Sequence, residues 1–266
     1  NVGVGSNALL AITTGNSNVA IGNSALTANT TGIQNVAIGG YYNASYVGAM
    51  GANTVGSECV AIGTAALQTA NENDNDGTIA IGWGACRVQA GTGGAQYANA
   101  TTAVGHKALT ALTTGQQNTA VGYQALDAEV DGDYSTAIGY AALTSQTGTD
   151  GSVHNTAVGA NSLGGTTTGT HNIGVGSNVL LTASTALRNT AIGFNAMTDT
   201  KAGIAVADCV AIGYDALKGH SSNTTTGVSG SVAIGKSALS ALTSGAGNTA
   251  VGYNASLVNV LGEYNT

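Results

Sequence analysis

The 266-residue chain contains no proline, and only 7% of its residues are charged. Ordinary globular domains carry about 5% proline and about 25% charged residues. Proline cannot donate a backbone N–H to a neighbouring strand, so its absence suits a chain that is hydrogen-bonded along its whole length. Without proline, and without a glycine at every third position, a collagen helix is excluded.

Positive charge is scarcer than negative charge, with six Lys and Arg against thirteen Asp and Glu and a net charge of −7. Binding to nucleic acid or to an anionic membrane surface depends on basic residues, so neither partner is expected. No apolar run approaches the roughly 18 residues of a spanning helix, so membrane insertion is not expected either. Three cysteines, Cys59, Cys86 and Cys209, are too few and too scattered for a disulfide framework.

What is present is a short repeat rich in glycine and small apolar residues. The string Asn-Val-Ala-Ile-Gly occurs at residues 18–22 and 35–39, and Asn-Thr-Ala-Val-Gly occurs at 118–122 and 248–252. Fourteen copies share a core glycine, located at Gly5, Gly22, Gly39, Gly63, Gly82, Gly105, Gly122, Gly139, Gly159, Gly176, Gly193, Gly213, Gly235 and Gly252. Such self-similarity at a fixed period is the signature of a solenoid.

The spacing of the core glycines gives the length of one coil. Seven of the thirteen intervals are 17 residues, and no interval is shorter. Longer intervals contain insertions, and the largest of these lie near residues 40–58, 83–100, 145–154, 198–208 and 218–230. Insertions in a solenoid form loops on one face, where binding sites are commonly found.

Seventeen residues are too few for a strand and a crossover helix, which need about 30. The repeat therefore predicts an all-β chain, residues 1–266 forming one continuous β-solenoid of about fourteen coils with two short strands each. A second glycine often follows two threonines, as in Thr13-Thr14-Gly15 and Thr30-Thr31-Gly32. We expect this glycine to turn the chain with a positive φ.

Alternation along each strand places Ala and Gly on one face and Val or Thr, Ile or Val, and Tyr on the other. Neither face is charged, and strands that are apolar on both sides are usually covered on both sides. Which face points into the coil stays open. Because a coil this small has a narrow interior, the second face is predicted to pack against another copy of the chain in a homo-oligomer.

The repeat Asn-Thr-Ala-Val-Gly-Tyr-x-Ala-Leu, with Thr-Thr-Gly connections, resembles the heads of trimeric autotransporter adhesins. Similar repeats occur in bacteriophage tail-fibre proteins, and the head-type string Ser-Val-Ala-Ile-Gly stands at residues 231–235. The resemblance covers essentially the whole chain and implies a left-handed parallel β-roll, a parallel homotrimer and an extracellular attachment fibre. Two features depart from the adhesin heads: the unit is longer than their repeat of about fourteen residues, and their neck, coiled-coil stalk and membrane anchor are not seen in the sequence given. The longer unit and its varied insertions favour the tail-fibre likeness.

The sequence begins at the first position of a unit, Asn1, and stops before the next core glycine, due at position 269. No polar capping repeat stands at either end, although solenoids need caps. We therefore expect either that this sequence is part of a longer fibre or that whole chains stack head to tail.

Two acidic stretches place oxygen ligands at alternate positions before a glycine, as in the first half of a calcium loop. The candidate calcium ligands are Glu72, Asp74 and Asp76 in one stretch and Asp127, Glu129 and Asp131 in the other. Neither stretch has the bidentate Glu at position twelve, so a solvated polar turn is the alternative. No other cofactor is expected.

Four tyrosines in the insertions, Tyr41, Tyr42, Tyr46 and Tyr97, are candidates for contact with a cell-surface glycan or protein receptor. The alternative is that these loops fold back over the roll. The remaining reactive residue types occupy repeat positions, because Cys59 and Cys209 share one position and His154 and His171 share another. These residues are therefore interpreted as structural.

Three classes of function remain. The first is the non-enzymatic shaft of a tail fibre on a virion, and the second is a trimeric adhesin on a bacterial cell that binds host matrix or glycans. The third is a polysaccharide-degrading β-helix, which needs two or more carboxylates in one groove. Only residues 127–133 approach that requirement, so we expect no enzyme.

Overall fold

A computed structural model describes residues 1–43, 45, 47–69, 76–88, 100–148, 151–199, 206–219, 227–257 and 261–266. Throughout these ranges the chain forms strands and turns and no helix, which confirms the all-β prediction. Accordingly, no helix suited to crossing a bilayer is found among them. The chain divides into two compact units, Asn1–Tyr134 and Ser135–Thr266.

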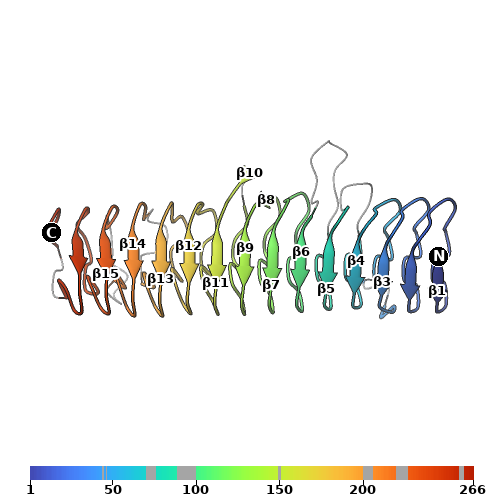
Figure 1. Ribbon diagram of the computed structural model, residues 1–266, viewed down its shortest axis with the longest axis horizontal. Coiled ribbons are helices and arrows are strands. Elements are labelled where there is room, and N and C mark those ends of the chain that lie inside the picture. Colours follow the sequence, from blue (N-terminus) through green and yellow to red (C-terminus); the bar gives the residue numbers. More distant parts are fainter. Residues whose placement is uncertain are drawn as a thin grey trace. The chain divides into compact units, whose positions relative to one another are not determined.

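Each unit contains seven three-residue strands, one for each coil (Figure 1). In the first unit they are β1 (Val2–Val4), β2 (Val19–Ile21), β3 (Val36–Ile38), β4 (Val60–Ile62), β5 (Ile79–Ile81), β6 (Thr102–Val104) and β7 (Thr119–Val121). In the second they are β9 (Thr136–Ile138), β11 (Thr156–Val158), β12 (Ile173–Val175), β13 (Thr190–Ile192), β14 (Val210–Ile212), β15 (Val232–Ile234) and β16 (Thr249–Val251). Two two-residue strands, β8 (Gly132–Asp133) and β10 (Gly151–Ser152), lie in insertions or turns.

Consecutive strands within each unit pair in parallel and in the register of the repeat. Val19, Ala20 and Ile21 of β2 pair with Val36, Ala37 and Ile38 of β3, for example. Every repeat position therefore forms a column along the sheet. This register confirms a parallel β-solenoid with a 17-residue coil.

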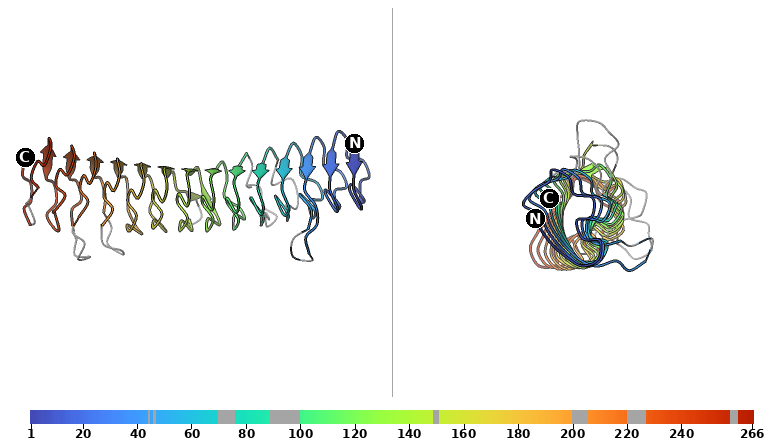
Figure 2. Two further views of the ribbon diagram at one scale, coloured as in Figure 1. Left: turned by 90° about the horizontal axis from the view of Figure 1, so that it is seen from below. Right: turned by 90° about the vertical axis from the view of Figure 1, so that its right-hand side faces the viewer.

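The prediction of two strands in every coil is wrong, because most of the described coils have one three-residue strand and close through turns; a second strand, of two residues, is described only at β8 and β10. Figure 2 shows the arrows along one side of the coils and the turn segments on the other. The second and fourth residues after the core glycine have left-handed backbones in every coil but the one that follows Gly39, as Ser24 (φ 60°) and Leu26 (φ 51°) do. A chain that alternates in this way cannot extend into a second strand.

The interior of the coil is filled by alanine and leucine. The central strand alanines, such as Ala20, are fully buried, and so is the leucine four residues after the core glycine, such as Leu26. The face of each strand that carries alanine therefore points into the coil, and the face with Val, Ile or Thr points outward. The left-handed backbone at the leucine position also explains its composition, because Leu, Met, Cys or Ser occurs there and a β-branched residue never does.

A ladder of buried asparagines joins successive coils at the residue before each strand. Asn18 accepts a hydrogen bond at Oδ1 from the backbone N–H of Asn35 (2.9 Å) and donates from Nδ2 to the Gly32 carbonyl (2.8 Å). Asn172 does the same with the Asn189 N–H (3.0 Å) and the Ala186 carbonyl (2.7 Å). Each asparagine thus satisfies two backbone groups that the turn leaves without a strand partner.

The ladder is interrupted where the repeat departs from asparagine. In the first unit its column continues through Cys59, Thr78 and Thr101, and in the second Ser135, Cys209 and Ser231 replace asparagine. The hydroxyl of Thr101 is buried and has no hydrogen-bond partner among the described residues. A hydroxyl donates and accepts through a single oxygen atom, and a thiol does so only weakly, so neither reproduces the separate donor and acceptor atoms of the amide.

The positive φ predicted for the glycine after two threonines is wrong. The glycine after two threonines does not have a positive φ, and a Cβ on Gly15 would lie 2.5 Å from the carbonyl oxygen of Gly32. A glycine is therefore required at this position because the backbone of the next coil lies too close for any side chain. The positive φ belongs to the core glycine instead, as at Gly22 (φ 128°).

Candidate functional surface

The outward face of the sheet carries uncharged β-branched side chains in every coil of each unit. Its two columns are the first and third strand residues, and all of them are Val, Ile or Thr. Ile21 is 40% exposed, Ile138 is 40% exposed and Ile192 is 38% exposed. Because the parallel register repeats these residues in every coil, each unit presents uncharged β-branched side chains side by side. We call these two columns the outer strand face.

Aromatic rings form a third column beside the outer strand face, at the residue that follows the core glycine. In the first unit the His106 ring stacks between Trp83 (centroids 5.0 Å apart, planes at 15°) and Tyr123 (5.3 Å, 8°). In the second unit Phe194 stacks on Tyr214 (5.5 Å, 16°). We call this set the ring column.

The ring column continues through a cation in the second unit. The Lys236 ammonium lies 5.6 Å from the Tyr214 ring centre and 5.7 Å from that of Tyr253. The rings are stacked face to face along the column, so a partner would contact their edges. That arrangement suits packing against another apolar surface better than stacking on a sugar ring, which needs an open face.

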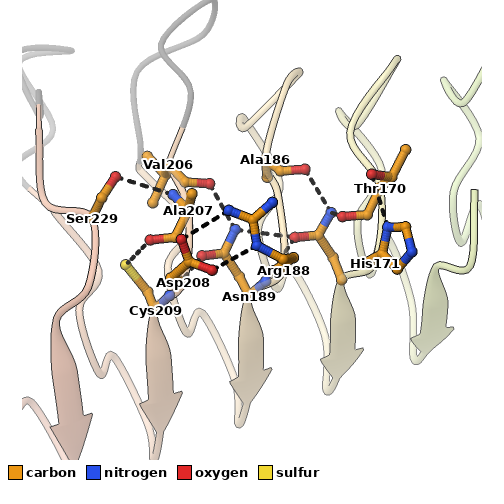
Figure 3. A network of polar contacts seen from close by, with 11 residues as sticks. Thr170, His171, Ala186, Arg188, Asn189, Val206, Ala207, Asp208, Cys209 and Ser229 are labelled. Atoms are coloured by element: carbon orange, nitrogen blue, oxygen red, sulfur yellow. Dashed lines mark hydrogen bonds and ion pairs between the residues drawn. The ribbon is translucent and has the colours of Figure 1, made fainter.

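Another surface column precedes the buried asparagines, and its members have left-handed backbones. In the second unit it reads His154, His171, Arg188 and Asp208. The Arg188 guanidinium binds the Asp208 carboxylate through two hydrogen bonds, of 2.7 and 2.9 Å (Figure 3). The hydrogen bond from Arg188 lowers the pKa of Asp208 and raises that of Arg188. Both side chains are more than half exposed, so the pair adds little stability.

Among the predicted calcium ligands, Asp76, Asp127 and Glu129 accept hydrogen bonds from nearby groups of the chain. Glu72 and Asp74 lie outside the described residues, and the carboxylate of Asp76 accepts the Ser57 N–H at 2.7 Å. Asp127 accepts a hydrogen bond from the Gln124 side chain (3.2 Å), and Asp131 is half-buried.

Glu129 is fully buried, and its Oε1 accepts the N–H groups of Val130 and Gly132 at 3.0 and 2.8 Å. It closes a turn, as Asn29 does in an earlier coil by accepting the Gly32 N–H. Within the described part of the chain, no three His, Cys, Asp or Glu side chains lie close enough to hold a metal ion.

Two of the four predicted receptor tyrosines can be placed. Tyr41 is 47% exposed and Tyr42 is 72% exposed, at the start of the insertion that follows β3. Tyr46 and Tyr97 lie outside the described residues. The chain returns from this insertion at Met50, which takes the place of the buried leucine. The insertion therefore leaves the interior of the coil intact.

The three cysteines are buried, and none of them forms a disulfide among the described residues. Burial, together with a smaller effect of the nearby Cys59, raises the pKa of the Cys86 thiol to about 12. Burial likewise raises the pKa of Cys209 to about 11, against backbone hydrogen bonds that lower it. Protonated buried thiols are unreactive, which agrees with the structural interpretation of these residues.

Sequence reasoning identified the aromatic position and both strand faces but missed the asparagine ladder. The available signal was that asparagine recurs before the strand and is replaced only by small side chains able to form hydrogen bonds. Comparison of the chain with protein-family models, with curated proteins and with solved structures gave no match.

Proposed function

We propose that this chain is a non-enzymatic structural fibre of an extracellular attachment appendage, of the kind that forms the shaft of a bacteriophage tail fibre. In this proposal three copies, each a left-handed β-roll, associate in parallel. The outer strand face is the observation that carries the proposal. Its side chains are uncharged and β-branched in every coil of both units, and they are exposed or half-buried.

The energetics of this face favour association of the chain with itself. Burying an isoleucine fully contributes about 1.5–3 kcal/mol, so a side chain that is two-fifths exposed has about 1 kcal/mol still to gain. Over the coils of one unit, this gain is of the order of the association cost, which is about 4–15 kcal/mol. A second copy of the chain presents the same columns in the same repeat, and no unrelated partner need match that repeat.

A bacterial surface adhesin is the second candidate, and Tyr41 and Tyr42 favour it. Both rings are exposed in an insertion that the coil does not require for its own packing. Exposed tyrosine is well suited to recognising glycans and proteins. In this version the same trimer would contact a cell-surface receptor directly, at the loops of its own roll.

Deletion of whole coils tests the shaft proposal. Removing residues 160–176 takes out one 17-residue unit, and a deletion of 160–193 takes out two. A shaft should retain its association state and shorten by about 4.8 Å per coil in electron micrographs. Loss of association on removing one coil would contradict the proposal, and so would release of reducing sugars from bacterial polysaccharide.

The adhesin version is tested with beads that carry the intact chain and a panel of bacterial cells. If the loops bind a receptor, the double variant Tyr41→Ala and Tyr42→Ala should abolish binding of the beads. Tyr253→Ala is the matched control, because Tyr253 is equally exposed but lies outside the insertion. A shaft without receptor contacts should show no difference between these variants.

A further inference from the structure

Two histidines lie next to each other on neighbouring coils of the second unit. His154 and His171 are both exposed, and each directly precedes a buried ladder asparagine. The His171 N–H donates to the Val153 carbonyl at 2.8 Å, which fixes the two backbones side by side. Both residues have left-handed backbones, with φ of 54° and 60°. Their side chains therefore leave the coils in the same direction.

The relation between these two rings differs from that in the ring column. The imidazole centres lie 5.2 Å apart with their planes at 42°, whereas the stacked pairs have planes at 8° to 16°. With Zn–N bonds of about 2.0–2.1 Å, a metal ion lies about 3.2 Å from each ring centre. Two centres 5.2 Å apart then subtend about 109° at the metal, which is the tetrahedral angle.

One of the two rings is also held by a neighbouring hydroxyl. Nδ1 of His171 lies 3.0 Å from Oγ1 of Thr170 (Figure 3). The Thr170 carbonyl in turn accepts hydrogen bonds from the Asn172 amide (3.1 Å) and the Arg188 N–H (3.0 Å), so this residue is fixed. When Nδ1 donates to the hydroxyl, Nε2 carries the lone pair that a metal ion needs. Orientation of a ligand histidine through its other nitrogen is a common property of metal sites.

The charges next to the pair permit a cation to bind. Arg188 follows His171 in the same column, and its charge is compensated by the two hydrogen bonds to Asp208. Imidazole nitrogen is a ligand for zinc, nickel and copper, whereas calcium and magnesium prefer oxygen. Since no third ligand is found among the described residues, water would complete the coordination.

We propose that His154 and His171 form a two-imidazole binding site for a divalent transition-metal ion of the zinc, nickel and copper group. The site lies within a single chain and is independent of the proposed fibre function. It is distinct from the calcium stretches, because it uses nitrogen ligands on adjacent coils and not oxygen ligands on one loop.

Calorimetric titration of the chelator-treated chain with Zn²⁺ at pH 7.5, in a buffer that does not coordinate metal, tests this site. We expect one ion per chain, released again by a chelator. His154→Asn and His171→Asn should each weaken binding at least about tenfold, and Thr170→Val about tenfold, as second-shell changes commonly do. Asparagine tolerates the left-handed backbone, so both histidine variants should keep the circular dichroism of the parent chain.

His106→Asn is the matched control, because asparagine occupies the same repeat position at Asn23 and His106 belongs to the ring column. It should bind Zn²⁺ like the parent. With Cu²⁺ as the probe, electron paramagnetic resonance should show two equatorial nitrogens that are lost in either histidine variant. Unchanged affinity in both variants, absence of binding in the parent, or equal loss in His106→Asn would overturn the proposal.

Discussion

The inward and outward faces of each strand are both apolar, but only the inward face is complete within one chain. Ala20 is fully buried, while the next residue, Ile21, is 40% exposed. Inside, the ladder asparagines satisfy the backbone groups of the turns; outside, the β-branched columns have no cover within the described part of either unit. The fold therefore depends on the inner face, and association is expected to depend on the outer one.

The largest effect is expected from breaking the inner ladder. Asn18→Ala removes the acceptor of the buried Asn35 N–H and one of the two donors to the Gly32 carbonyl, which keeps its hydrogen bond from the Asn29 side chain (3.1 Å). The unsatisfied N–H costs about 1–3 kcal/mol, so we expect a loss of about 2 kcal/mol. Hydrogen exchange of the amides in β2 and β3 measures this locally, which matters because repeat arrays open in parts.

Asn23→Ala is the matched control for the ladder variant. Asn23 is exposed five residues further along the same coil, and its side chain contacts only Ser24 among the interactions described. Exchange protection should change by less than about 0.5 kcal/mol, as is usual for surface substitutions. Equal effects of the two substitutions would show that the buried ladder does not stabilise the coil.

A substitution in the outer strand face should weaken association and leave the stability of the single chain almost unchanged. Ile192→Lys places a charge in the outer strand face, where the side chain is 38% exposed. Thermal stability of the single chain should change little, while the dissociation constant of the oligomer should rise at least about tenfold because an unpaired charge is costly to bury. Sedimentation velocity over a dilution series measures this, and association unchanged by the lysine would place the interface elsewhere.

The buried thiols give the inner face a dependence on pH. A Cys86 pKa of about 12 in the folded chain exceeds the ordinary value of 9.0, so the stabilising contribution is complete below pH 9 and is lost as the pH rises toward 12. At pH 10 we expect a loss of about 1 kcal/mol. Melting curves at pH 8 and pH 10 should show a smaller decrease for Cys86→Ala than for the parent; equal decreases would contradict this assignment.

The smallest effect should come from repairing the ladder. The Cys209 thiol lies 3.3 Å from the Val228 carbonyl, which occupies the place of the carbonyls that ladder asparagines bind. Cys209→Asn should therefore gain a hydrogen bond to Val228 and stabilise the second unit by about 0.5–1 kcal/mol. Chemical denaturation measures the change, and destabilisation would mean that this coil has no room for an amide.

The sequence predicted the features that repeat and missed those that depend on stacking. The core glycine spacing led to the parallel solenoid, and alternation in Asn-Val-Ala-Ile-Gly defined the two strand faces before their direction was known. The second strand was predicted wrongly because left-handed backbones at residues such as Ser24 and Leu26 have no clear sequence signature.

The candidate surface was predictable only in part, for a similar reason. Asn18 binds groups fourteen and seventeen residues away, and these contacts exist only once one coil lies on the next. The pairing of His154 with His171 likewise follows from coil register, although their shared repeat position was visible in the sequence. Contacts between coils are therefore predicted by comparing residues at the same repeat position in successive coils, and not by searching for local motifs.

Sedimentation equilibrium of the intact chain tests the central claim most directly, because the claim is that three outer faces cover one another. We predict a particle of three times the chain mass of 25.8 kDa that persists on dilution and dissociates in the Ile192→Lys variant. A chain that remains monomeric at the highest attainable concentration, with its strand signal intact, would contradict the account.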